Sequence, residues 1–257
     1  MGFLFDGVSS RSMGIKSYLR QWELMPGLEN QFLTLPGRDG GLDLGSTLGM
    51  RTIRLEAGFL PQASVSNLSD KIDTLTAWLS PEKGAKRLVL DEFPDRYFLA
   101  RVSENLMLTR VLRMMGSFEL TFLAPDPFAY ALEDETAVYT EPGTFRFTRQ
   151  KGNSSSSPIL RVKATFTESN RPRLLLTINH ETLVLSGIAP SGSILEIDCG
   201  MQTVRLLNSR GELIGNGMPL LEEPVFPTLL MGENTVSIKA ERFDSFEVSL
   251  HACSRWR

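Results

Sequence analysis

Gly116-Ser-Phe-Glu-Leu-Thr-Phe-Leu-Ala-Pro-Asp-Pro-Phe-Ala-Tyr130 is the stretch on which the prediction of the fold depends, because its character changes halfway along. Its first part alternates apolar and polar side chains in the order Phe118, Glu119, Leu120, Thr121 and Phe122. A period of two is typical of a β-strand with one buried face. Proline has no backbone N–H and restricts the residue before it, so Pro125 and Pro127 prevent a central strand from continuing. We therefore predict that a second structural unit begins near Pro127.

Length and composition indicate a two-domain globular protein. The chain has 257 residues, of which 42% are apolar, and this is enough for two cores of ordinary domain size. The predicted domains are residues 1–127 and 128–257. The chain has 27 Lys and Arg against 30 Asp and Glu, and neither half is a basic tail, so no sequence-specific nucleic-acid partner is expected.

Membrane and disulfide signals are both weak. No apolar run approaches the ~20 residues that are needed to span a bilayer, and no membrane partner is expected. Nothing at the beginning of the sequence directs secretion. Two cysteines, Cys199 and Cys253, are too few for a disulfide framework in a chain of this length. We expect reduced thiols.

The N-terminal half combines strands with one helix. Apolar residues recur at intervals of three and four between Asn67 and Leu79, which predicts a helix whose apolar stripe packs on a sheet. Residues 87–92 and 97–102 are expected to form a hairpin whose turn is Phe93-Pro-Asp-Arg96. The glycine-dense stretch Thr34 to Gly45 indicates a hairpin arm. It has neither of the glycine motifs that bind phosphate, so a nucleotide site is not predicted.

Two further features have consequences for the fold. Residues 105–115 are apolar on both faces, which indicates either a central strand or an arm that is buried against a neighbouring subunit. After Pro127 the sequence contains only short strands separated by turn residues, and this is the pattern of an antiparallel β-sandwich. The predicted fold class is therefore mainly β.

A search for catalytic and metal-binding motifs gives a negative result. The sequence has no Gly-x-Ser-x-Gly, no His-Glu-x-x-His and no Cys-x-x-Cys. The acidic run Glu133-Asp-Glu135 is interpreted as a solvated linker. A metal site made from His180, Cys199, His251 and Cys253 is rejected because Cys199 has the strand parity of buried neighbours. No catalytic residue, cofactor-binding residue or metal ligand is predicted, and the protein is not expected to be an enzyme.

Several motifs, taken in order, carry a resemblance to a known family. They are Pro36-Gly-Arg-Asp-Gly40, Asp91-Glu-Phe-Pro-Asp-Arg-Tyr97, Phe118-Glu-Leu-Thr-Phe122, Asp126-Pro-Phe-Ala-Tyr130 and Leu230-Met-Gly-Glu-Asn-Thr-Val-Ser-Ile238. Together they resemble the distal tail proteins of long, flexible-tailed bacteriophages (siphophages). The second half is similar to the galectin-like C-terminal domain of that family.

The resemblance implies a structural protein of the virion, assembled in the cytoplasm of the host bacterium. Family members form hexameric rings, alone or stacked, that join the tail tube protein to a tail-associated tip or baseplate protein. Residues 1–127 would then form the ring, or belt, and residues 128–257 would be a galectin-like β-sandwich domain that projects outward. Head-to-tail contacts that close into a ring would suit the hydrophobic arms.

The residues that we expect at the interfaces of such a ring are Trp22, Phe32, Leu42, Met107, Val111 and Met115. An alternative function is a carbohydrate-binding module that attaches a phage or an enzyme to the host cell surface. Such a module normally presents exposed aromatic side chains beside polar groups, and the C-terminal half shows no evident cluster of this kind.

Overall fold

The computed structural model describes residues 1–60, 65–104, 108–112, 115–165, 172–187 and 192–257. Within these ranges the chain is mostly β-strand, with one α-helix, as the sequence predicts. It divides into two compact units, Met1–Leu132 together with Arg257, and Glu133–Trp256. The ring-forming and galectin-like roles that we assigned to the two halves stay predictions.

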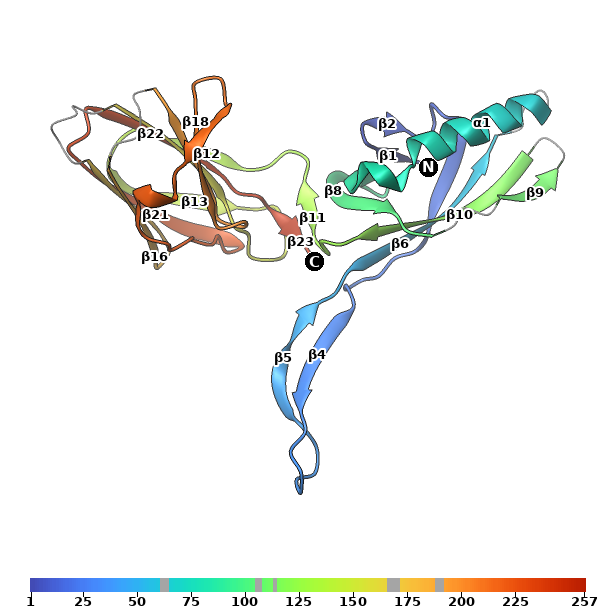
Figure 1. Ribbon diagram of the computed structural model, residues 1–257, viewed down its shortest axis with the longest axis horizontal. Helices are drawn as coiled ribbons and strands as arrows, with labels where there is room; N and C mark the ends of the chain where they lie inside the picture. Colours follow the sequence, from blue (N-terminus) through green and yellow to red (C-terminus); the bar gives the residue numbers. More distant parts are fainter. Residues whose placement is uncertain (61–64, 105–107, 113–114, 166–171, 188–191) are drawn as a thin grey trace. The chain divides into compact units, whose positions relative to one another are not determined.

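Antiparallel strands that are linked by hydrogen bonds form the body of the N-terminal unit, in the order β2-β1-β7-β8-β10-β6-β3 (Figure 1). The strands are β1 (Phe3–Phe5), β2 (Val8–Ser9), β3 (Ile15–Gln21), β6 (Arg51–Phe59), β7 (Lys86–Leu90), β8 (Phe93–Val102) and β10 (Met115–Ala124). Two short strands extend it: β9 (Leu108–Leu112) pairs with β10, and β11 (Ala129–Ala131) pairs with β8. Strand β10 ends at Ala124, directly before Pro125, which confirms the predicted end of that strand.

Alternating burial defines the core of this unit. In β6 every second residue from Arg51 to Phe59 is buried, and β10 contributes Phe118, Leu120 and Phe122 to the same core. Thr121 is buried as well, and its hydroxyl donates a hydrogen bond to Glu104 at 2.9 Å. Residues 117–124 of β10 pair with residues 51–58 of β6, which aligns their apolar faces.

The predicted helix exists as α1 (Val65–Trp78), followed by the 3-10 turn η1 (Pro81–Lys83). Its apolar stripe includes Leu68 and Leu75, both buried, and it ends on Trp78. The Trp78 ring stacks on Phe3 with the ring centres 5.5 Å apart, and its indole N–H donates to the Phe5 carbonyl at 3.2 Å. This contact fixes the end of the helix against β1. Helix α1 has 14 residues, and no helix in the described ranges is long and apolar enough to cross a membrane.

The predicted turn Phe93–Arg96 is wrong. Strand β8 begins at Phe93, and Leu90 pairs with Phe93, so the turn is formed by Asp91 and Glu92. Pro94 lies inside β8, where the register shifts between Leu88 and Leu90. Such an irregularity leaves some backbone groups of β8 outside the ladder, and a proline is tolerated there.

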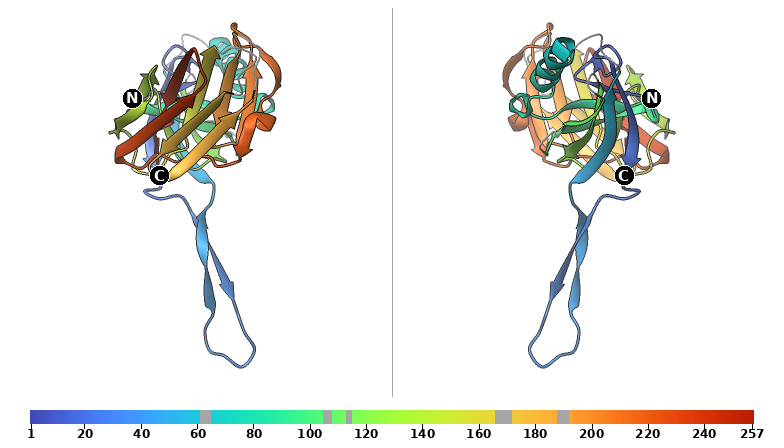
Figure 2. Two further views of the ribbon diagram at one scale, coloured as in Figure 1. Left: turned by 90° about the vertical axis from the view of Figure 1, so that its left-hand side faces the viewer. Right: turned by 90° about the vertical axis from the view of Figure 1, so that its right-hand side faces the viewer.

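The predicted arm is a separate hairpin of β4 (Leu28–Leu33) and β5 (Leu42–Leu48). These strands pair only with each other and extend away from the sheet of their own unit (Figure 1; the right-hand view of Figure 2). At the tip, Gly37 and Gly40 have φ of 78° and 79°, a conformation that favours glycine.

Two antiparallel sheets form the C-terminal unit, and the predicted β-sandwich is confirmed (Figure 2). The first sheet, in spatial order, contains β12 (Thr136–Tyr139), β22 (Ser245–His251), β14 (Ile159–Thr165), β17 (Ile194–Asp198), β18 (Thr203–Leu207) and β19 (Leu213–Asn216). The second contains β13 (Gly143–Arg149), β21 (Gly232–Glu241), β15 (Arg173–Ile178), β16 (Glu181–Ser186) and β20 (Leu221–Glu223). The remaining elements are the 3-10 turn η2 (Met218–Leu220) and β23 (Arg255–Trp256).

One apolar core lies between these sheets. Leu160 and Val248 from the first sheet and Leu176 and Ile238 from the second belong to the same buried cluster. The predicted turn at Asn179-His-Glu181 is present, and Asn179 adopts a φ of 56° there. Asparagine is one of the few residues that accept this conformation readily.

Candidate functional site

The arm is strongly exposed along both of its strands. Every residue of β4 is exposed, and β5 is exposed except at its two ends. Its large apolar side chains are also open to solvent: Phe32 is 63% exposed, Leu44 62% and Leu28 53%. A two-stranded ribbon has no second layer against which to bury such residues, and it is only marginally stable alone. The arm therefore has the properties of a surface that binds a partner.

The arm root, which we define as residues 22–27 and 49–51, continues this apolar surface. Leu24 is 89% exposed, and Met25 and Met50 are exposed as well. The two connecting segments are tied together by a backbone hydrogen bond of 2.7 Å from the Gly49 N–H to the Gly27 carbonyl. This hydrogen bond joins the two segments that connect the arm to the sheet.

Aromatic rings anchor the arm root to the sheet. The Trp22 ring lies 4.7 Å from Phe93 and 5.5 Å from Phe98, measured between ring centres. The guanidinium of Arg51, at the start of β6, lies 5.0 Å from the Trp22 ring centre and 5.7 Å from that of Phe98. These distances are typical of cation–π contacts.

Arg51 is an unusual cation because its side chain is fully buried. Its Nε and Nη2 atoms have no hydrogen-bond partner in the described part of the chain. Burial lowers the pKa of Arg51, and the negative charge of Glu23 opposes this shift. The faces of the aromatic rings therefore stabilise a charge that has been removed from water.

The predicted interface residues fall in two places. Phe32 and Leu42 lie on the arm, where Phe32 pairs with Asp43 and Leu33 pairs with Leu42, and Trp22 lies at the arm root. Val111 belongs to β9 and Met115 to β10, which form a second hairpin whose backbone alone is described at these positions. Met107 lies outside the described residues. The sequence interpretation missed Leu44, Leu24 and Met50, although their proximity to the glycine-rich tip and to Pro26 was a usable signal.

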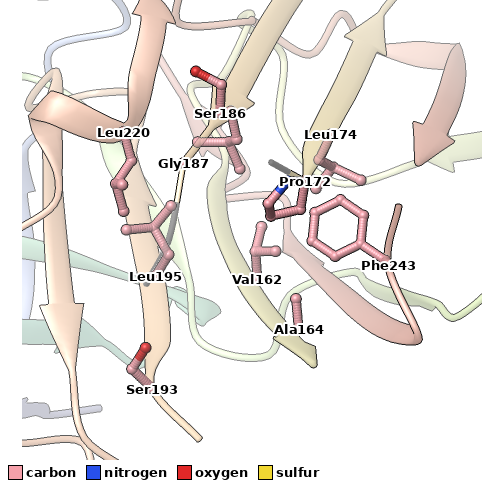
Figure 3. A pocket seen from close by; sticks show the side chains of 11 residues that line it. Val162, Ala164, Pro172, Leu174, Ser186, Gly187, Ser193, Leu195, Leu220 and Phe243 are labelled. Atoms are coloured by element: carbon pink, nitrogen blue, oxygen red, sulfur yellow. The ribbon is translucent and has the colours of Figure 1, made fainter. Parts of the chain in front are cut away.

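The C-terminal unit has a small apolar pocket between its two sheets (Figure 3). Val162 and Leu195 from the first sheet and Leu174 from the second line it, together with Phe243 and Leu220. It encloses about 50 Å³, which is far below the several hundred Å³ of an ordinary small-molecule site. We therefore assign it to imperfect packing at the end of the sandwich.

Of the acidic run at the start of this unit, Glu133 is exposed, but the interpretation as a solvated linker is wrong for Asp134 and Glu135. The side chain of Asp134 is only 3% exposed, and its Oδ2 accepts a hydrogen bond from the Ser254 N–H at 2.7 Å. Glu135 accepts hydrogen bonds from the N–H groups of Gln150 and Lys151, at 3.0 and 2.9 Å. The two carboxylates tie the segment before β12 to the chain after β13 and to the C-terminal segment.

The histidines and cysteines do not form a metal centre. His180 is exposed in the β15–β16 turn and Cys199 is buried in the core, whereas His251 Nδ1 lies 3.3 Å from Cys253 Sγ. In the described ranges, no three His, Cys, Asp or Glu side chains are grouped so that they could hold a metal ion. Burial raises the pKa of Cys199 to about 12 and that of Cys253 to about 11, so both thiols are protonated at neutral pH.

Comparison with known proteins identifies the N-terminal part. Residues 12–124 match the family model of the phage tail protein RIFT-related domain. This part of the chain is similar to a phage tail protein domain. A search of curated protein sequences found no match.

Solved structures extend the similarity to the C-terminal unit. The Dit protein (gp 19.1) of phage SPP1 has a similar fold, with a TM-score of 0.71 and 18% sequence identity over 100% of this chain and 99% of that chain. Chains of the phage P2 baseplate in its activated conformation, with Ca and with Sr, give TM-scores of 0.50 and 0.53 at 8% and 9% identity. They cover 97% of this chain and 97% and 96% of theirs. The resemblance to the siphophage distal tail proteins is thereby confirmed, at the level of the fold.

The arm lies inside the phage tail domain. Strands β4 and β5 and the arm root all fall within residues 12–124, between the paired strands β3 and β6. The exposed apolar surface is therefore part of the region that the family model matches and is connected to β3, at the edge of the sheet, and to its neighbour β6.

Proposed function

We propose that this protein is a structural subunit of the hub at the distal end of a siphophage tail. In this proposal six copies form a ring, alone or stacked, and the ring joins the tail tube protein to a tail-associated tip or baseplate protein. Its place is the virion, after assembly in the host cytoplasm. The observation that carries the proposal is the similarity over the whole chain to SPP1 Dit, which is described as a paradigm of the hub adsorption apparatus in Gram-positive infecting phages.

The distribution of apolar surface supports this proposal. The arm exposes Phe32, Leu44 and Leu28 on a two-stranded ribbon that no other described strand of its unit extends. A ring is closed by head-to-tail contacts in which a projecting element of one copy meets a different surface of the next. We assign residues 1–127 to the ring and residues 128–257 to an outward, galectin-like domain. The proposed ring interface includes Trp22, Phe32, Leu42, Met107, Val111 and Met115.

The proposed role is mechanical rather than catalytic. The family model that matches residues 12–124 describes a phage tail domain, and the three similar structures named above are a Dit protein and two baseplate chains. We assign no cofactor, and the contribution of the protein is shape and adhesive surface.

Negative-stain imaging of the purified full chain tests the proposal. Class averages should show an annulus with sixfold symmetry and an open centre, either for the protein alone or after mixing with the tail tube protein. The proposal would be contradicted by particles that remain single two-lobed molecules under both conditions.

A further inference from the structure

A row of charged side chains crosses the first sheet of the C-terminal unit on its outer face. The strand register places Ser249, Arg161, Glu196 and Arg205 opposite one another on β22, β14, β17 and β18. Their neighbours along each strand, such as Leu160, Ile197 and Val204, belong to the core. Because side chains alternate between the faces of a sheet, the charged row points away from the core.

The centre of this row is a buried carboxylate between two guanidinium groups. Glu196 has a side chain that is only 8% exposed, and it accepts a hydrogen bond from Arg161 Nε at 2.8 Å and forms an ion pair with Arg205 Nη2, also at 2.8 Å. The two arginine side chains are themselves about half exposed, at 57% and 50%. Glu196 therefore holds two guanidinium groups in fixed positions, while their remaining N–H donors face solvent.

The charge of the row is not balanced. One carboxylate serves two guanidinium groups, and the neighbouring Lys163 is neutralised by Glu247 at 3.1 Å. Within this row one positive charge is in excess, and the next outward carboxylate of β17, Asp198, accepts hydrogen bonds from the N–H groups of Gly200 and Met201. An exposed, fixed and unbalanced guanidinium pair is suited to binding an anion in two-point contact.

The row lies in a trough. One hollow of about 390 Å³ is lined by Arg161, Glu196 and Arg205, with Ile194, Leu207 and Leu213 as its apolar wall. A second hollow, of about 370 Å³, contains Thr136, Val138, Ile159 and His251. Arg161 and Ser249 line both hollows, so the two lie next to each other. Each has the size of an ordinary small-molecule site.

We propose that this trough binds an anionic saccharide chain, that is, linked polyhydroxylated units that carry a carboxylate or a phosphodiester group. The trough runs across the strands, so a ligand in it meets side chains and not the backbone groups with which a peptide pairs at a sheet edge. Guanidinium, hydroxyl and imidazole groups beside aliphatic side chains match the hydroxyls and the C–H faces of sugars. Neighbouring strands are about 4.8 Å apart, which is comparable to one pyranose unit.

This inference goes beyond the proposed hub role, and it gives the saccharide-binding alternative a definite location. The ligand-binding groups of the proposed site are two arginines held by Glu196, and not the exposed aromatic rings that a carbohydrate-binding module normally presents. Ring formation and saccharide binding can succeed or fail independently, because the trough lies within the C-terminal unit and all its residues come from one chain.

Calorimetric titration of the full chain tests the proposal with three chains of similar length: oligogalacturonate, a glycerol phosphate oligomer and neutral maltohexaose. At least one anionic chain should bind at least tenfold more tightly than maltohexaose, and the affinity should fall as salt is added. The two anionic probes distinguish a carboxylate from a phosphodiester. Absence of binding by both at millimolar concentration overturns the proposal, as does tighter binding of oligoglutamate, which would indicate an acidic protein partner.

Variants locate the site. Arg205→Gln should weaken binding about tenfold, since it removes one charged hydrogen-bond donor. Arg146→Gln is the matched control: Arg146 is also an exposed arginine in a surface ion pair, with Glu233, but on the second sheet. Equal losses in the two variants would contradict a defined site.

A third variant tests whether the ligand occupies the hollows themselves, and it leaves Arg161, Glu196 and Arg205 unchanged. Ser249→Phe keeps every charge but places a ring where the two hollows meet. Binding should be lost by tenfold or more while the melting temperature of the C-terminal unit is retained. Unchanged affinity in this variant would place the ligand elsewhere.

Discussion

The guanidinium of Arg51 lies 5.0 Å from the centre of the Trp22 ring, at the point where the arm joins the sheet. One residue precedes the arm and the other follows it, so their contact closes the base of the hairpin. In the described part of the N-terminal unit, β4 and β5 pair only with each other. Its orientation with respect to the sheet of its unit therefore depends on this buried cation and the rings around it.

Trp22→Ala should lower the free energy of unfolding of the N-terminal unit by about 3 kcal/mol. The substitution removes a large aromatic side chain and leaves the buried Arg51 without its main aromatic contact. Calorimetry of the full chain measures the effect on the transition of this unit. Lys16→Ala, at an exposed position of β3, is the control and should change stability by less than about 0.5 kcal/mol. Equal stability of the two variants would show that Trp22 is not an anchor.

Phe32→Asp and Leu44→Asp should leave the monomer folded and weaken self-association by about tenfold or more each. Both side chains are more than 60% exposed in the single chain, so a charge costs little there, whereas it is expensive in a buried interface. Analytical ultracentrifugation across a concentration series measures the change. Thr47→Asp adds the same charge at an exposed polar position of β5. If it dissociates the protein as strongly, the effect is general repulsion and the apolar side chains of the arm are not the contact.

Gly152→Ala should destabilise the C-terminal unit by about 3 kcal/mol. Gly152 has a φ of 90°, and a Cβ there would lie 2.6 Å from the carbonyl oxygen of Arg255, a backbone atom that cannot move alone. Gly232→Ala isolates the cost of the conformation, because Gly232 has a φ of 85° but open space around it. It should cost only about 1 kcal/mol. Urea denaturation of both variants measures how much each lowers the free energy of unfolding. Similar decreases in the two variants would show that the contact with the Arg255 carbonyl oxygen contributes nothing.

Lowering the pH should reduce the free energy of unfolding of the C-terminal unit, because Glu135 becomes protonated. Burial alone would raise the pKa of this carboxyl, but hydrogen bonds from the backbone N–H groups of Lys151 and Gln150 and from the Ser254 hydroxyl outweigh it and lower the pKa below the ordinary value. A carboxyl with a lowered pKa stabilises the fold above its unfolded pKa of about 4.3, and this stabilisation is lost as the pH falls through the folded value. Stability should therefore decline below about pH 4.5.

Glu135→Gln tests this assignment. At pH 7 it should cost about 1 kcal/mol, a figure reduced for solvent screening because the group is only partly buried, and the acid-induced decline should become shallower. Glu133→Gln removes an exposed carboxylate two residues away and should leave both stability and the acid profile unchanged. Thermal unfolding between pH 3 and pH 7 measures both variants. A full acid decline in Glu135→Gln would assign the effect to another group.

Local patterns predicted much of the fold. The alternation of Phe118, Leu120 and Phe122 identified β10, and the spacing of Leu68 and Leu75 identified α1, because burial on one face imposes these periods. The arm was found from its glycines, which allow the turn at its tip.

The failures have a common cause, which is that partners distant in the sequence decide the outcome. Pro94 was interpreted as a turn residue, but an irregular register in the pairing of β7 and β8 accommodates it. Asp134 was interpreted as a solvated carboxylate, but Ser254, from the other end of its unit, binds it. The trough depends on the register that brings Arg161, Glu196 and Arg205 into one row, and no local pattern specifies that register.

The molar mass of the purified full chain in solution tests the central claim most directly. Light scattering should give six times the 28.6 kDa of one chain, or twelve times if two rings stack, and the Phe32→Asp variant should shift the mass downward. A mass of 28.6 kDa that persists at high protein concentration and in the presence of the tail tube protein would contradict the account of this chain as the subunit of a hub ring.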